Sequence, residues 1–210
     1  MSHMEKTFDR KKHWEQVYKG KSPLEVSWFQ LQPTHSLRFI QSTGITKQDF
    51  IIDVGGGASV LVDRLLDDGY ENLAVLDISS SALEHAKQRL GERAEKVKWY
   101  EADITSFNPP NAYSLWHDRA VFHFLTQKSD REKYIKTLKK AVPRHGHIIL
   151  AAFSIGGPKK CSGLDIVQYD AGKLLNVLGD EFVLVEEIEE SHMTPANNEQ
   201  KFSYFRLVRL

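Results

Sequence analysis

Residues 51–57 of the chain read Ile-Ile-Asp-Val-Gly-Gly-Gly, an apolar run with one acidic residue that ends in three glycines. This run, with the phenylalanine before it, predicts a short buried strand over residues 50–54. Gly55 and Gly57 lack a Cβ and can take a positive φ, so they suit a tight turn that brings the backbone close to a ligand. A helix predicted from residue 59 to 68 would point its N-terminus at that ligand. The glycines could also form a plain loop with no ligand.

Strands and helices alternate along the chain after this turn. Apolar runs and helical spacing predict further strands over residues 73–76, 97–100, 113–116 and 147–153, and helices over residues 80–90 and 131–142. Near the end, a polar segment of residues 189–201 rather than a helix joins two predicted strands, 182–188 and 202–208, which should therefore pair as an antiparallel hairpin. We predict an α/β fold with three layers: a Rossmann-like sheet of about seven strands, mostly parallel, with a C-terminal antiparallel hairpin.

The chain has 210 residues, which fits one domain, and we assign residues 8–210 to it. Residues 8–45 are aromatic and helix-prone, so we expect an N-terminal helical lid on a Rossmann-like core of residues 46–210. Residues 1–4 resemble the remnant of a tag and are left out of the predicted fold.

Charge disfavours some kinds of partner, and the cysteine content excludes some kinds of site. Lysine plus arginine and aspartate plus glutamate number 28 each, so no long-range field favours nucleic acid or an anionic membrane. The one cysteine, Cys161, excludes an internal disulfide and a multi-cysteine zinc site. No apolar stretch approaches the roughly 20 residues that cross a bilayer. We expect a cytoplasmic protein, monomeric or homodimeric, without a metal, nucleic acid or membrane partner.

Three acidic residues stand at the carboxyl ends of successive predicted strands. Asp53 precedes the glycines, Asp77 ends the second strand 20 residues beyond Gly57, and Asp103 follows the third strand. A carboxylate at the position of Asp77 can accept hydrogen bonds from both hydroxyls of a ribose, although it could also cap the next helix. Asp103 by itself could be a solvated loop residue. Because open α/β sheets bind ligands at this edge, the three acids together predict a nucleoside site.

The glycine run departs from the dinucleotide-binding pattern Gly-x-Gly-x-x-Gly, because Val60 stands at its last position. The run resembles instead the first motif of the class I S-adenosylmethionine-dependent methyltransferases, hydrophobic-hydrophobic-Asp/Glu-x-Gly-x-Gly-x-Gly, except that Ser59 replaces the last glycine. The resemblance covers roughly Trp14 to Leu210. It implies S-adenosylmethionine as the cofactor, with Asp103 near the adenine amino group and the next residue against the ring. The cofactor-binding residues that we expect are Trp28, Asp53, Gly55, Gly56, Gly57, Ser59, Asp77, Ile78, Asp103, Ile104 and His117.

The methyl acceptor should lie over the end of the fourth predicted strand, where the chain continues with His117, Asp118 and Arg119. Methyl transfer is an in-line displacement in which the protein aligns the acceptor and removes a proton where there is one. His117 could be the base near neutral pH, Asp118 could orient it or a cationic acceptor, and Arg119 could pair with either. These three residues are the catalytic candidates. The alternative is a structural Asp118–Arg119 pair that locks the turn.

The class of acceptor stays open between several alternatives. Asp118-Arg119-Ala120 resembles the matching turn of the thiopurine and thiol methyltransferases, and residues 14–30 resemble the lid of that group and of the protein-lysine methyltransferases. Trp28 could cover the methionine end of the cofactor and exclude water, or be part of the core. We expect a small-molecule acceptor such as a thiol or similar nucleophile. Protein lysine is the first alternative, followed by a cofactor-binding protein without catalysis and, more distantly, an NAD-dependent reductase.

Overall fold

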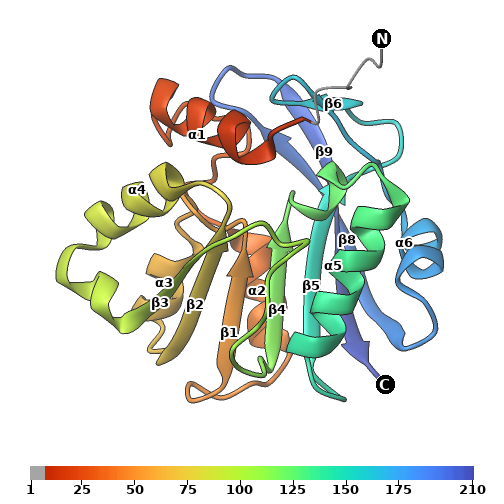
Figure 1. The fold of residues 1–210 in the computed structure, drawn as a ribbon. Helices are drawn as coiled ribbons and strands as arrows, with labels where there is room; N and C mark the ends of the chain where they lie inside the picture. Colours follow the sequence, from red (N-terminus) through yellow and green to blue (C-terminus); the bar gives the residue numbers. More distant parts are fainter. Residues whose placement is uncertain (1–7) are drawn as a thin grey trace, which may run out of the picture.

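A seven-stranded sheet in the order β3-β2-β1-β4-β5-β9-β8 forms the centre of the molecule in the computed structural model, which describes residues 8–210 (Figure 1). The suggested tag remnant therefore lies outside the described residues. The strands are β1 Phe50–Val54, β2 Asn72–Asp77, β3 Val97–Glu101, β4 Leu115–Arg119, β5 His147–Phe153, β8 Phe182–Met193 and β9 Glu199–Arg209. The first five pair in parallel, and β9 runs antiparallel to both β5 and β8. The predicted mostly parallel sheet with a C-terminal antiparallel hairpin is confirmed.

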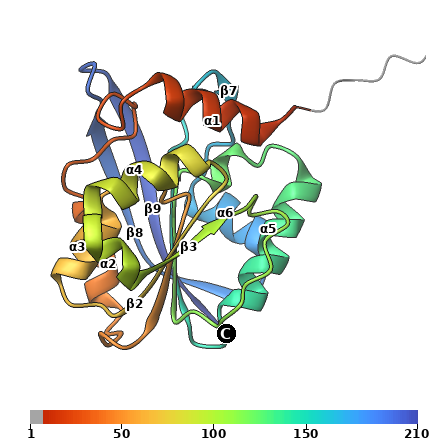
Figure 2. The ribbon, with the colours of Figure 1, turned by 60° about the vertical axis from the view of Figure 1, so that its left-hand side comes forward.

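Helices cover both faces of the sheet, which makes the three predicted layers. The helices are α1 Arg10–Gly20, α2 Thr34–Ser42, α3 Leu61–Asp67, α4 Ser80–Leu90, α5 Lys128–Ala141 and α6 Ala171–Leu178, with short 3-10 segments η1 Gly91–Lys96 and η2 Phe122–Phe124. One face packs against α5 and α6, and the other against α2, α3 and α4. Helix α1 lies instead across the carboxyl ends of the parallel strands (Figure 2), near a small hairpin of β6 Lys160–Cys161 and β7 Leu164–Asp165. No helix in the described part of the chain has both the length and the apolar character needed to cross a bilayer.

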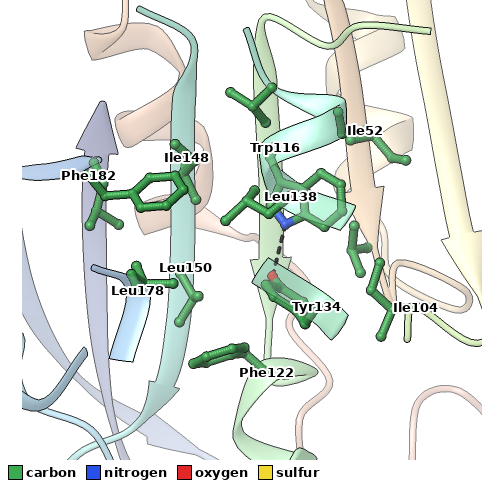
Figure 3. Packing of buried hydrophobic residues seen from close by; sticks show 14 of the residues in the cluster. Ile52, Ile104, Trp116, Phe122, Tyr134, Leu138, Ile148, Leu150, Leu178 and Phe182 are labelled. Atoms are coloured by element: carbon green, nitrogen blue, oxygen red, sulfur yellow. Dashed lines mark hydrogen bonds between the residues drawn. The ribbon is translucent and has the colours of Figure 1, made fainter. Parts of the chain in front are cut away.

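The two-residue period of β4 decides which layer each of its side chains meets. Trp116 packs in the core under α5, where its indole N–H donates a hydrogen bond of 2.9 Å to the Tyr134 hydroxyl (Figure 3). Leu115 packs in the opposite core, under α2 and α3. Fully burying one such apolar side chain contributes roughly 1.5–3 kcal/mol, so this alternation is strongly determined. His117 consequently shares the face of Leu115, and Asp118 that of Trp116.

Strand β4 differs from its predicted position, because it covers residues 115–119 and not 113–116. His117, Asp118 and Arg119 therefore belong to the strand itself, and the turn comes at Ala120, which has a φ of 73°. Patterning alone misplaced the strand because buried polar residues are rare in strands unless partners satisfy them. Here His117 and Asp118 are both buried, and both have such partners.

The C-terminal hairpin is also longer than predicted. Strands β8 and β9 extend to Met193 and from Glu199, so only residues 194–198 connect them, instead of residues 189–201. The acidic segment can be a strand because β8 is the edge of the sheet, where every second side chain faces solvent. The extension carries Glu190 toward the ligand edge of the sheet, where it contacts residues of the candidate site.

Candidate active site

The glycine turn after β1 brings three backbone segments into close contact. Gly55 has a φ of 71°, and its N–H donates to the carbonyl of Leu76 at 2.6 Å. A Cβ on Gly56 would collide with the carboxylate of Asp53. Gly57 does not have the positive φ that we expected; it is needed because a Cβ there would lie 2.5 Å from Asp77 Oδ2. The turn is therefore packed directly against two of the three predicted acids.

Asp77 ends β2 at the mouth of the site and is 6% exposed. Its Oδ2 atom accepts a hydrogen bond of 3.0 Å from the Gly57 N–H, and its Oδ1 atom accepts one of 2.9 Å from the Ser79 N–H. Burial raises the pKa of this carboxyl to about 6, despite those N–H donors. The residue that caps helix α4 is Ser79, whose Oγ accepts from the Ala82 N–H at 3.1 Å. Asp77 is thus not the helix cap.

Asp103 follows β3 and is anchored by its own loop and by helix α1. Its Oδ1 atom accepts from the Thr105 N–H at 2.8 Å and from the Thr105 hydroxyl at 2.7 Å. Its Oδ2 atom lies 3.3 Å from a guanidinium nitrogen of Arg10, which also pairs with Asp130. Asp103 is therefore a fixed acid at the ligand edge and not a freely solvated loop residue.

Asp77 and Asp103 line one pocket of about 780 Å³, part of it open to solvent, along the carboxyl ends of the central strands. Six of the expected cofactor residues line it: Trp28, Gly55, Asp77, Ile78, Asp103 and Ile104. Four others line an adjoining cavity, which shares Tyr18, Trp28, Gly55 and Arg119 with the first: Asp53, Gly56, Ser59 and His117. Gly57 lines neither and acts through its contact with Asp77. The pocket of about 780 Å³ is called the main pocket below, and the adjoining one the second cavity.

Aromatic residues of the N-terminal segment cover the main pocket. Trp14 and Tyr18 come from α1, and Trp28 from the loop after it. The ring centroid of Trp14 lies 5.7 Å from that of Trp28 and 5.0 Å from that of Phe124. These edge-on aromatic contacts close the pocket on the side away from the sheet.

Polar contacts hold α1 in this position. Glu15 accepts hydrogen bonds from the Ser80 hydroxyl at 2.9 Å and the Ser81 hydroxyl at 2.6 Å, at the N-terminus of α4. Burial raises the pKa of Glu15, but the hydrogen bonds from Ser81 and Ser80 outweigh it and bring the pKa to about 2. Lys11 pairs with Glu101 at the end of β3. The helix is thus docked on the core by charged and polar groups, with its aromatic face turned inward.

The three catalytic candidates do not form one group, because Asp118 points to one face of β4 and His117 and Arg119 point to the other. Asp118 is fully buried in the α5 layer, where it accepts from the Tyr134 hydroxyl at 2.6 Å and from the Val121 N–H at 2.9 Å. Burial raises its pKa to about 6. Arg119 donates to the Tyr204 hydroxyl at 2.7 Å and to the Trp28 carbonyl at 2.8 Å. The alternative of an Asp118–Arg119 pair is therefore wrong, since each residue has other partners.

His117 lies on the other face and is 3% exposed. One ring nitrogen, Nδ1, is 2.7 Å from Asp53 Oδ1, and the other, Nε2, is 2.8 Å from the Ser36 hydroxyl. Both nitrogens therefore have protein partners, which leaves neither free to take a proton from an acceptor in this structure. Of the three candidates, Arg119 is the one that lines the main pocket.

Several lining residues were not expected from the sequence. Tyr18 and Arg10 line the main pocket from the same helix face as Trp14, which their four-residue spacing could have indicated. Cys161 also lines it, and burial raises the pKa of its thiol to about 11, so the thiol is protonated at neutral pH. Ser36 had no local signal, because its role depends on a partner 81 residues away.

Comparison with known proteins agrees with this geometry. Residues 51–146 match a family model described as a methyltransferase domain. The chain is 29% identical over 98 residues to the eEF1A lysine and N-terminal methyltransferase of Danio rerio, covering 47% of this chain and 14% of that protein. It is 31% identical over 105 residues to the malonyl-[acyl-carrier protein] O-methyltransferase of Anoxybacillus flavithermus, covering 49% and 38%. The chain thus spans less than half the length of both curated relatives.

A solved structure extends the likeness to nearly the whole fold. The N-methyltransferase NodS of Bradyrhizobium japonicum, in complex with S-adenosyl-L-homocysteine, superimposes with a TM-score of 0.68 at 17% identity, covering 96% of this chain and 99% of that one. The family match begins in β1 and ends just before β5, so it includes the glycine turn and all three acids of the nucleoside edge. With the sheet order of the complete fold, this match over residues 51–146 shows that the chain carries a methyltransferase domain with the fold of the class I S-adenosylmethionine-dependent methyltransferases.

Proposed function

We propose that this enzyme transfers a methyl group from S-adenosylmethionine to a small molecule whose nucleophile carries no positive charge, a thiol or a similar nucleophile. The observation that carries the proposal is the position of Arg119. It is the charged residue at the end of the main pocket that lies away from the nucleoside edge. A cation there favours an anionic or neutral acceptor over a protonated amine.

The residues that line the two cavities fit S-adenosylmethionine bound across the carboxyl ends of the strands. Asp77 would accept hydrogen bonds from the ribose hydroxyls, and Ile78, Asp103 and Ile104 would hold the adenine. At the amino-acid end, Asp53 lines the second cavity, and its Oδ2 atom is buried without a hydrogen-bond partner among residues 8–210. A buried carboxylate oxygen of this kind suits an ammonium group. When bound, the cofactor supplies an electrophilic methyl group on a sulfonium sulfur.

The acceptor end of the main pocket follows from the sheet order. Asp77 and Asp103 stand over β2 and β3, so the opposite end of the pocket lies over β4, where the lining side chains are aromatic or apolar apart from Arg119. Trp14, Trp28 and Phe124 surround this end. These rings would exclude water from the reacting atoms and hold the acceptor in line with the methyl group.

Arg119 is held firmly and keeps one donor free. Tyr204 and the Trp28 carbonyl fix two of its nitrogens, whereas its third nitrogen is buried and makes no hydrogen bond to any residue that the structure describes. Glu190 forms an ion pair with that nitrogen at 3.8 Å, which is too long for a hydrogen bond but offsets part of the Arg119 charge. The free N–H group can stabilise a thiolate or carboxylate. Two like charges about 4 Å apart repel each other by about 1 kcal/mol in water and about 4 kcal/mol near a protein surface, which disfavours a lysine ammonium.

A labelled-donor assay tests the proposal. The enzyme would be incubated with S-adenosylmethionine carrying a labelled methyl group and with thiols, carboxylates, amines and a protein extract in parallel. We expect label in a small thiol or another small nucleophile. Label found in protein, with every small molecule unlabelled, would reject a small-molecule acceptor.

A protein lysine is the second candidate acceptor. It is favoured by the Danio rerio relative, whose name describes a lysine methyltransferase. The aromatic rings of Trp14 and Trp28 could also hold a cationic amine through cation–π contacts. The protein-extract arm of the same assay distinguishes this candidate, because a lysine acceptor gives a labelled protein band that survives denaturation.

Replacing Arg119 tests the acceptor site directly. A hydrogen bond to a charged group contributes about 1.5–3 kcal/mol, so Arg119→Met should lower kcat/KM for the acceptor roughly 10- to 100-fold. The affinity for S-adenosylhomocysteine, measured by calorimetry, should change much less. Arg38→Met is the matched control, because Arg38 pairs with Glu186 outside both cavities. Equal losses of acceptor kinetics and cofactor affinity would contradict a specific role at the acceptor end.

A further inference from the structure

Three buried side chains from three different elements form one hydrogen-bonded chain beside the glycine turn. The Ser36 hydroxyl, on α2, lies 2.8 Å from His117 Nε2 on β4, and His117 Nδ1 lies 2.7 Å from Asp53 Oδ1 on β1. Ser36 is 1% exposed, and His117 and Asp53 are each 3% exposed. All three line the second cavity.

Strand register explains why this chain forms. Asp53 and His117 are register partners in the parallel pair of β1 and β4, so both side chains emerge on the same face of the sheet. Helix α2 covers that face and places Ser36 over the imidazole. A carboxylate can only accept, so Nδ1 is the donor to Asp53, and Nε2 shares a hydrogen bond with the Ser36 hydroxyl. The serine thus holds the imidazole in the orientation in which Nδ1 faces Asp53.

The hydrogen-bonded chain uses one carboxylate oxygen of Asp53 and leaves the other without a partner. Oδ1 is held by His117, while Oδ2 is buried and makes no hydrogen bond to the described residues. Oδ2 is directed at the glycine turn, since a Cβ on Gly56 would collide with it. An unpaired buried carboxylate oxygen costs free energy, so it points to a ligand group that completes it.

The order carboxylate, imidazole, hydroxyl is also that of the serine hydrolases, but the surroundings differ. A nucleophilic serine must reach a substrate carbonyl. Ser36 is almost completely covered, at 1% exposure, and sits inside helix α2 against the sheet. The atom without a hydrogen-bond partner is Oδ2 of Asp53, at the opposite end of the hydrogen-bonded chain. The arrangement therefore suits holding a carboxylate in place rather than attack by the serine.

We propose that His117 is a positioning residue for the cofactor: it fixes the Asp53 carboxylate so that Oδ2 receives the ammonium group of the amino-acid end, and Ser36 fixes His117. The proposal rests on the proposed function, because it takes S-adenosylmethionine as the ligand. It adds that helix α2, which carries no atom that need touch the cofactor, contributes to cofactor affinity through Ser36. It also replaces the expected role of His117 as a base.

Two ligands that differ only in the amino-acid end test this role. S-adenosylhomocysteine carries the ammonium and carboxylate groups, whereas 5′-methylthioadenosine keeps the adenosine and the thioether without them. His117→Phe keeps a planar ring and removes both nitrogens, so it should weaken S-adenosylhomocysteine binding about tenfold or more. Binding of 5′-methylthioadenosine should change less than about twofold. His117→Asn retains an N–H donor and should recover part of the loss.

Ser36→Ala provides a second variant that leaves the imidazole in place. It should weaken S-adenosylhomocysteine about two- to fivefold, again with 5′-methylthioadenosine unaffected. Ser42→Ala is the matched control on the same helix, because the Ser42 hydroxyl bonds only the carbonyl of Phe39 at 2.8 Å. If His117→Phe is too unstable to purify, the comparison of Ser36→Ala with Ser42→Ala carries the test.

The possible outcomes separate this inference from the function on which it rests. Parallel losses for both ligands in the variants would show that His117 is only structural, and unchanged affinity for S-adenosylhomocysteine would show that it does not position Asp53. Either result overturns the inference while leaving the cofactor assignment intact. A wild-type protein that binds neither ligand would instead reject the cofactor assignment.

Discussion

Asp77→Asn should weaken S-adenosylhomocysteine binding by roughly 100-fold, since each hydrogen bond to a charged group contributes about 1.5–3 kcal/mol and tenfold in affinity is about 1.4 kcal/mol. The carboxylate already accepts from the N–H groups of Gly57 and Ser79, and it lies in the main pocket where the ribose hydroxyls are expected. An amide at this position must turn an NH₂ group toward one of those two backbone donors. The variant therefore loses both the charge and the local geometry. Isothermal calorimetry measures the effect, and unchanged affinity would mean that the ribose assignment is wrong.

The pH dependence of binding gives an independent control on Asp77. Burial raises the pKa of its carboxyl to about 6. Ribose hydroxyls donate to the ionised form, so cofactor affinity should be full above pH 7 and fall as the pH drops through 6. At one pH unit below the pKa about one carboxyl in eleven is ionised, so the affinity at pH 5 should be about tenfold lower. In Asp77→Asn this part of the pH dependence should disappear. Affinity that rises on acidification would have the wrong sign.

Gly57→Ala should be the most damaging substitution in the glycine turn. The added Cβ would lie 2.5 Å from both the Cβ of Ala82 and Oδ2 of Asp77, closer than real Cβ contacts. Overpacking of this kind costs about 1–3 kcal/mol of stability. It would also displace Asp77, so cofactor affinity should fall by roughly 100-fold, as when the carboxylate itself is lost. Thermal unfolding and calorimetry measure the two effects separately.

Gly20→Ala is the matched control for this substitution. Gly20 ends helix α1, and a Cβ there meets no atom within 4 Å. The control should change stability by no more than about 0.5 kcal/mol and leave cofactor affinity unchanged. If Gly57→Ala behaved like Gly20→Ala, the close approach of the turn to Asp77 would not exist in solution.

The local sequence was sufficient to predict the sheet and its nucleoside edge. Short apolar runs that alternate with helical patterns specify a parallel sheet, and the carboxyl ends of such strands must meet at one edge. For this reason the sequence predicts that Asp53, Asp77 and Asp103 lie at one edge, and the structure places Asp53 and Asp77 against the glycine turn and Asp103 in the main pocket that Gly55 also lines.

The local sequence could not predict where the strands end or which way their side chains point. The burial of His117 and Asp118 is tolerated because Asp53, Ser36 and Tyr134 satisfy them, and those partners lie between 16 and 81 residues away along the chain. The polar triplet of residues 117–119 was therefore predicted to follow the strand, although it belongs to the strand itself. One residue of register decides whether such a side chain faces the ligand or the opposite core.

Periodicity and motif spacing thus predicted the fold and the edge of the sheet where the ligand binds, because these depend on patterns within about ten residues and on the topology of parallel sheets. The kind of cofactor was implied by the resemblance of the glycine run to a family motif. The roles of the individual side chains came from the tertiary structure alone. Register between β1 and β4 joined Asp53 to His117, packing of α2 added Ser36, and the long hairpin brought Tyr204 to Arg119. Each of these contacts joins segments that only the folded sheet brings together, so no local pattern could have encoded it.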